Sequence, residues 1–137
     1  MPRFSLRPAS NAIDPRPPVI FVVDDDAAVL ASLKFALELD GLEIQTVDNG
    51  LKLLKHPSLA NASCIVLDYK MPGMDGFEVL TELERRNIKV PVILITSPIT
   101  ERTRARARRA GNVVFVLEKP LLDNLLLDHI RKLIGPG

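Results

Sequence analysis

Six polar side chains stand at or just after the ends of short apolar runs in this 137-residue chain: Asp24, Asp25, Asp26, Asp68, Thr96 and Lys119. Clustered carboxylates repel one another unless a cation joins them, and oxygen ligands suit Mg²⁺ or Mn²⁺ better than Zn²⁺. Beside such a cation, a hydroxyl and an ammonium group complete a site for a phosphoryl group, with a carboxylate as the nucleophile. These residue types therefore predict phosphoryl chemistry, provided that the fold brings them together.

The elements that must position these residues follow a regular alternation. Five apolar runs rich in branched side chains are typical of buried strands, at residues 19–23, 42–47, 64–67, 92–95 and 113–117. The segments between and after them have helical spacing, at about residues 27–40, 51–54, 76–86, 100–110 and 121–134. This pattern predicts an α/β fold, a doubly wound, flavodoxin-like (βα)5 domain with a five-stranded parallel sheet.

The predicted sheet would bring the polar side chains to one edge. Ligands of such sheets bind beyond the carboxyl ends of the strands, where the strand order reverses. For the order 2-1-3-4-5 that point lies between the first and third strands, which end in the acidic triplet 24–26 and in Asp68. Thr96 and Lys119 follow the fourth and fifth strands at the same edge. Each residue alone is more often a cap, a strand residue or a solvated charge, so the prediction depends on all four strand ends.

Four motifs at these strand ends resemble the receiver domain of two-component response regulators: Val23–Asp26, Leu67–Gly76, Ile95–Ser97 and Glu118–Pro120. The resemblance covers residues 19–134. It implies a phosphorelay protein that takes a phosphoryl group from a histidine kinase or a histidine phosphotransfer protein. The signal would then pass on by conformational change and protein contacts, to a downstream protein target or within a homodimer. Such a protein is a phosphoacceptor and not an enzyme that turns over a separate substrate.

The resemblance also implies roles for the acidic residues. Asp68 would be the phosphoacceptor. Asp25 and Asp68 would bind Mg²⁺ (or Mn²⁺) directly, and Asp24 would act through a water molecule. The main-chain carbonyl of Lys70 would be a further metal ligand. Thr96 would be the hydroxyl that responds to the phosphoryl group.

At the end of the fifth strand, Lys119 would contact the phosphate, and the Lys119–Pro120 peptide bond is expected to be cis. The family usually has an aromatic residue three positions before this lysine, where Val116 stands, whereas Phe115 stands four before it. The stretch from Gly111 to Lys119 is therefore one residue longer than the family pattern, which predicts a bulge. We favour a bulge between Val116 and Lys119, which would keep Phe115 as the switch residue; otherwise Val116 takes that place.

Two surfaces could carry the output. The segment 100–110 has two arginine stripes beside a small apolar face, and we expect a loosely packed helix that can shift. A solvated basic helix is an equally good interpretation, and direct nucleic-acid binding has no aromatic support in this segment. The last helix is apolar on more than one face, so its surplus could bind a partner or a second copy.

The composition of the chain restricts the class of protein. The chain is 47% hydrophobic and 26% charged with a formal net charge of +1, which predicts a globular protein without general attraction to nucleic acid or membranes. No apolar run reaches the about 20 residues of a membrane span, so we expect a cytoplasmic protein. The single cysteine, Cys64, lies in an apolar run and is expected to be a buried, inert thiol. Residues 1–18, rich in Pro and Arg, are expected to form an arm before a domain at residues 19–137.

Three functions remain open at this point. We favour a receiver without an attached output domain. A receiver separated from a DNA-binding domain is the second possibility. The third is a magnesium-dependent phosphatase or phosphotransferase similar to the haloacid dehalogenases, but these need a second acid where Lys70 stands.

Overall fold

The computed structural model describes residues 18–121 and 124–135. Its centre is a five-stranded parallel sheet with the order β2-β1-β3-β4-β5, which confirms the predicted fold class. The strands are β1 (Val19–Val23), β2 (Glu43–Val47), β3 (Cys64–Asp68), β4 (Val92–Thr96) and β5 (Val113–Glu118). The first seventeen residues of the expected arm lie outside the described residues.

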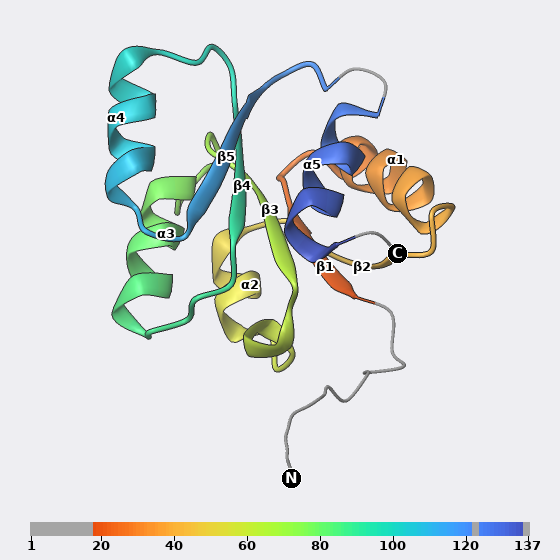
Figure 1. Cartoon of the computed structure of the whole chain (residues 1–137). Coiled ribbons are helices and arrows are strands. Elements are labelled where there is room, and N and C mark those ends of the chain that lie inside the picture. Colours follow the sequence, from red (N-terminus) through yellow and green to blue (C-terminus); the bar gives the residue numbers. More distant parts are fainter. Residues whose placement is uncertain (1–17, 122–123, 136–137) are drawn as a thin grey trace, which may run out of the picture.

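Helices cover both faces of the sheet (Figure 1). They are α1 (Ala27–Glu38), α2 (Gly50–Lys55), α3 (Gly76–Arg85), α4 (Glu101–Arg109) and α5 (Leu125–Ile134), with a short 3-10 helix at Leu59–Asn61. α1 and α5 pack on one face, and α2, α3 and α4 pack on the other. None of the described helices has the length and hydropathy that a membrane span requires.

The central strands are buried on both faces, as their apolar runs predict. All five residues of β3 and all five of β4 are buried. Along β1, Phe21 and Val23 pack toward α2 and α3, whereas Ile20 and Val22 pack toward α1 and α5. Two separate apolar layers therefore hold the middle of the sheet in place.

Side-chain caps fix where two helices begin, next to the ends of β1 and β3. The Asp26 carboxylate accepts hydrogen bonds from two main-chain N–H groups in the first turn of α1. Asp75 and Glu78 form a reciprocal capping box at α3. At Gly76 a Cβ atom would lie 2.9 Å from the carbonyl oxygen of Asp68, so only glycine allows this close approach. The loop after β3 is thus held tightly against the end of its own strand.

The pairing of β4 with β5 contains the predicted irregularity, but in a different place. Val92 pairs with Val113 and the next residue, Ile93, pairs with Phe115, so Val114 is the extra residue. Val114 is 48% exposed. The prediction of an extra residue is confirmed, and its placement between Val116 and Lys119 is wrong.

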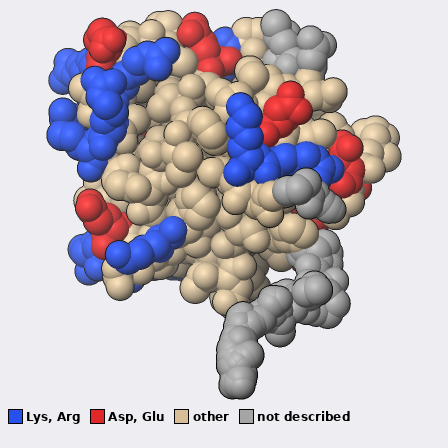
Figure 2. Space-filling model, in the orientation of Figure 1, with Lys and Arg blue, Asp and Glu red and all other residues tan. Residues whose placement is uncertain are grey.

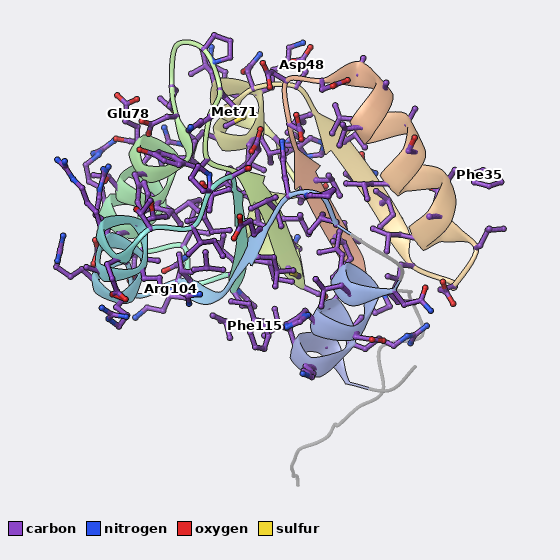
Figure 3. The ribbon with its side chains drawn as sticks, turned by 90° about the horizontal axis from the view of Figure 1, so that it is seen from above. Phe35, Asp48, Met71, Glu78, Arg104 and Phe115 are labelled. Atoms are coloured by element: carbon purple, nitrogen blue, oxygen red, sulfur yellow. The ribbon has the colours of Figure 1, made fainter. Side chains whose placement is uncertain are left out.

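This bulge decides which side chain lies on the face of Thr96. Phe115 packs with the α1–α5 layer, and its ring contacts the ring of His129 edge-on at 4.6 Å between centroids (Figure 3 labels Phe115). Val116 pairs with Leu94 and packs in the α2–α4 layer. Thr96 follows Leu94 by two residues, so it shares the face of Val116. The preference for Phe115 in the position facing Thr96 is therefore wrong, and Val116 occupies that position.

The last helix also differs from its prediction. It begins at Leu125, later than the expected residue 121. Leu127, Leu133 and Ile134 are partly buried against the α1–α5 layer, so most of its apparent surplus packs onto the domain itself. Leu125 remains exposed, at 39%. The α5 surface is consequently less apolar than the sequence indicates.

Candidate functional site

Three carboxylates meet where β1 and β3 end. β1 and β3 are neighbours, with Val23 paired to Leu67, so the residues that follow them, Asp24 and Asp68, emerge side by side. One carboxylate oxygen from each of Asp24, Asp25 and Asp68 lies within 4.8 Å of the other two. Asp24 and Asp68 are buried, whereas Asp25 is exposed. The structure thus brings together the three acids that the sequence predicts as metal ligands.

Lys119 reaches this cluster from the end of β5. Its Nζ atom lies 3.3 Å from Oδ1 of Asp68 and 3.4 Å from Oδ2 of Asp24. Its main-chain N–H donates to the carbonyl oxygen of Thr96 at 2.9 Å, which anchors the backbone. The Lys119–Pro120 bond is cis, as the resemblance predicts. One ammonium group is therefore shared between two buried carboxylates.

The charges of the cluster are unbalanced. Burial raises the pKa of Asp68, the Asp24 carboxylate raises it further, and Lys119 opposes both. Burial also disfavours the charge on Lys119, but the carboxylates of Asp68 and Asp24 outweigh it and raise the lysine pKa. The single lysine does not neutralise the acids, so additional positive charge would stabilise the site.

Thr96 ends β4, beside β3. Its side chain is 2% exposed, and its hydroxyl oxygen has no hydrogen-bond partner among the described residues. A buried hydroxyl without a partner costs about 1–3 kcal/mol. The sequence predicts the position of this residue at the sheet edge, and the unsatisfied hydroxyl is a feature that only the structure reveals. It leaves a donor for an oxygen-rich ligand.

The loop between β3 and α3 completes the surroundings. The main-chain N–H of Tyr69 donates to Ile95 at 2.8 Å, and Gly76 donates back to Tyr69 at 2.8 Å, so the loop is closed at both ends. Lys70 lies within it and, together with Met71 and Pro72, lines an open groove (Met71 is labelled in Figure 3). The role of the Lys70 carbonyl as a metal ligand stays a prediction. Asp26, the third acid of the triplet, caps α1 instead.

Comparison with protein families matches residues 20–131 to the response regulator receiver domain. The chain belongs to this family. It is 37% identical over 112 residues to nodulation protein W of Bradyrhizobium diazoefficiens, covering 82% of this chain and 49% of that protein. It is 33% identical over 115 residues to the transcriptional regulatory protein FixJ of the same organism, covering 84% and 56%. The receiver chain therefore spans about half the length of these curated relatives.

Solved structures agree with the assignment. The structure of FixJ-N is 30% identical with a TM-score of 0.74, and the match covers 84% of this receiver and 91% of that chain. The chemotaxis protein CheY4 of Vibrio cholerae is 22% identical with a TM-score of 0.77, covering 85% and 98%, and shows likeness of fold alone. The receiver family is a signalling family and not a typical enzyme family, which agrees with the expectation from the motifs.

One feature near the site was not predicted from the sequence. An open groove of about 590 Å³ runs between α1 and the segment after β5, lined by Ala28, Val29, Ser32, Leu33, Ser97, Lys119, Pro120 and Leu121. The α1 residues have the helical spacing of a core face, so no pattern marks them as surface. Because Lys119 lines this groove and also contacts Asp68, the groove adjoins the carboxylate cluster.

Proposed function

We propose that Asp68 of this receiver accepts a phosphoryl group from a histidine kinase or a histidine phosphotransfer protein in a reaction that depends on Mg²⁺. The observation that carries the proposal is the convergence of three carboxylates within 4.8 Å with Lys119 at 3.3 Å from Asp68. Among the three acids, Asp68 is the one on β3, between β1 with its acids and β4 with Thr96. It is therefore the carboxylate that every other group of the site surrounds.

The donor set suits a hard divalent cation. All its side-chain groups are carboxylate oxygens, and within the described part of the chain no histidine or cysteine belongs to the cluster. Asp24, Asp25 and Asp68 would hold Mg²⁺, with the Lys70 carbonyl as a further ligand. The ion would neutralise charge on the phosphoryl oxygens. The raised pKa of Asp68 supports this, because its ionised form needs more positive charge than Lys119 supplies.

The remaining residues perform the transfer. A carboxylate oxygen of Asp68 attacks the phosphorus of a phosphohistidine, a new O–P bond forms, and the N–P bond breaks with its electron pair leaving on the imidazole. The Lys119 ammonium and the Thr96 hydroxyl donate hydrogen bonds to the phosphoryl oxygens. Both donors already lie at this edge of the sheet, so the transfer requires little rearrangement.

The groove along α1 is the docking place that this proposal assigns to the phosphodonor protein. It is open and apolar along Val29 and Leu33. Lys119 belongs to both the groove and the site, so a helix seated on α1 would have its phosphohistidine near Asp68. This location also explains why residues with core-like spacing remain accessible on α1.

A second candidate function has a specific observation in its favour. Relatives such as FixJ are named transcriptional regulatory proteins, and this chain matches 56% of the length of that protein. The domain would then be the receiver part of a transcriptional regulator, with the same chemistry at Asp68. The length of the natural gene separates this candidate from a receiver that acts alone.

Intact-mass measurement after incubation with phosphoramidate and Mg²⁺ tests the proposal. The wild type should gain one phosphoryl group, and chelation of Mg²⁺ should prevent the gain. Asp68→Asn should gain none. Asp26→Asn is the matched control, because it removes a neighbouring charge while asparagine keeps the helix cap, and it should be phosphorylated like the wild type. Phosphorylation of Asp68→Asn would show that the acceptor is another residue.

A further inference from the structure

Helix α4 carries an unusual concentration of guanidinium groups. It has five arginines and no lysine: Arg102, Arg104, Arg106, Arg108 and Arg109. Its two buried residues, Thr103 and Ala107, are small, so the arginines project well beyond the helix. Figure 2 shows basic side chains gathered over this side of the domain. The planar, weakly hydrated guanidinium suits carboxylate binding at interfaces better than lysine does.

Little of this charge is neutralised within the domain. Across residues 18–121 and 124–135, the ion pair formed by an α4 arginine is that of Arg108 with Glu101, at 4.0 Å with both side chains exposed. A pair of that kind contributes little stability. The arginines are therefore available to a ligand.

The arginines fall on two flanks of α4. At about 100° per residue, Arg102, Arg106 and Arg109 share one flank, and Arg104 and Arg108 share the other. The first flank borders a groove of about 170 Å³ between α3 and α4, in which Arg106 and Arg109 face Leu80, Thr81 and Glu84. The two flanks thus have similar charge and different surroundings.

One of the groove arginines is already held in place. The guanidinium carbon of Arg106 lies 4.0 Å from the centroid of the Phe77 ring, and Phe77 is buried. This cation–π contact orients the guanidinium plane and leaves its N–H edges free to donate. The groove therefore combines the fixed guanidinium of Arg106 with that of Arg109, above an apolar base formed by Phe77 and Leu80.

We propose that the groove between α3 and α4 binds an acidic, amphipathic segment of a partner protein. A carboxylate of the segment would pair with Arg106 and Arg109, and an apolar side chain would pack on Phe77 and Leu80. The groove would be the surface through which the receiver contacts its downstream partner. Binding there does not depend on which acid is phosphorylated.

The groove favours a peptide over nucleic acid. Glu84 stands on the α3 side of the same groove and is exposed. A continuous polyanion would meet this carboxylate, whereas a peptide can place its acids on the α4 side alone. The volume of about 170 Å³ also suits one or two side chains.

A second copy of the chain is a less suitable occupant. The exposed apolar residues Phe35 and Leu39 lie near Glu38 on α1 and could enter the groove of another molecule. However, α1 and α4 lie on opposite sides of the domain, with Phe35 pointing outward (Figures 1 and 3). Such a head-to-tail contact does not close into a symmetric dimer and would produce rings or open chains.

Selection of a phage-displayed library of random short peptides on the full chain provides the probe. Enriched peptides should combine two or more acidic residues with a leucine, isoleucine or phenylalanine. For one synthesised peptide, the double variant Arg106→Gln, Arg109→Gln should weaken binding about tenfold or more, because charge-assisted hydrogen bonds are lost. The matched double variant Arg104→Gln, Arg108→Gln makes the same charge change on the other flank and should stay within about twofold.

Arg109→Gln alone guards against a loss of folding, since it keeps the contact of Arg106 with Phe77 and should still weaken binding. Enriched peptides without acidic residues, or equal effects of the two double variants, would overturn the proposal. So would a short DNA duplex whose binding depends on Arg106 and Arg109, which would assign the groove to nucleic acid. If sedimentation shows oligomers of the wild type that dissociate in the double variant Arg106→Gln, Arg109→Gln, the groove binds a second copy of the chain instead. All of these outcomes are independent of phosphorylation at Asp68.

Discussion

The edge of the sheet at β1 and β3 and the region of β5 and α4 are built in opposite ways. Every residue of β3 is buried, and the loop that follows it is closed by main-chain hydrogen bonds. β5 has one buried residue, Leu117, and contains the bulge at Val114, and α4 buries two small side chains. The first region holds several reactive groups in fixed positions, and the second has little packing that resists a shift. The two regions are therefore packed to different degrees, and under the proposed function the first would carry the phosphoryl chemistry and the second the response.

The largest contrast should appear in stability. Leu94 on β4 is fully buried, so Leu94→Ala should lower the free energy of unfolding by about 2–5 kcal/mol. Val114→Ala in the bulge should change it by about 0.5 kcal/mol or less, since that side chain is half exposed. Denaturant unfolding measures both. Comparable losses would mean that β5 is as firmly packed as β4.

Replacing a glycine by alanine should give the second-largest difference between the two regions. Gly76→Ala places a methyl group 2.9 Å from the Asp68 carbonyl oxygen, so it should cost about 1–3 kcal/mol and slow phosphorylation. Gly111→Ala, before β5, meets no atom within 4 Å and should change neither property by a measurable amount. Thermal unfolding and the rate of phosphorylation by phosphoramidate test the pair. A normal rate in Gly76→Ala would show that the loop after β3 need not be fixed.

The acidic cluster should destabilise the domain when no cation is bound. Because the pKa of Asp68 is raised in the folded state, its contribution is favourable at low pH and is lost as pH rises through the folded pKa. In a chelating buffer at neutral pH, the free energy of unfolding of Asp68→Asn should therefore exceed that of the wild type by on the order of 1 kcal/mol. The variant should accordingly unfold at a higher temperature. The advantage should shrink as the pH falls through the folded pKa of Asp68, and it should be lost below about pH 4, near the unfolded pKa of aspartate. An advantage that is equal at both pH values would contradict this account.

The smallest effect concerns the route from Thr96 to α4. Val116 shares the face of Thr96, so Val116→Ala should reduce the phosphorylation-dependent chemical-shift changes at the buried residues of α4. Phe115→Leu should leave them nearly unchanged, since Phe115 packs against α5. Because valine is branched and restricted at χ1, we expect a modest response even in the wild type. Loss of the response in Phe115→Leu would return the switch to the aromatic residue.

Sequence patterns predicted the acidic edge of the sheet, where β1 and β3 end, better than the region of β5 and α4, for a physical reason. Strands buried on both faces have continuous apolar runs, and the parallel sheet then brings the acids after β1 and β3 together without further information. The segment 113–116 is Val-Val-Phe-Val, in which every register buries an apolar side chain, so only pairing with β4 decides that Val114 bulges out. The stacking of Arg106 on Phe77 needs the spacing of α3 and α4, which no local pattern encodes.

The central claim is that Asp68 is the one acid of the cluster that forms the covalent phosphate. Borohydride reduction converts an aspartyl phosphate into homoserine, and peptide mass spectrometry then locates the converted residue. After incubation with phosphoramidate and Mg²⁺, we predict homoserine at position 68 alone, with residues 24 and 25 unchanged. Homoserine at position 24 or 25, or a phosphoryl group that stays on His56 or His129, would contradict the account.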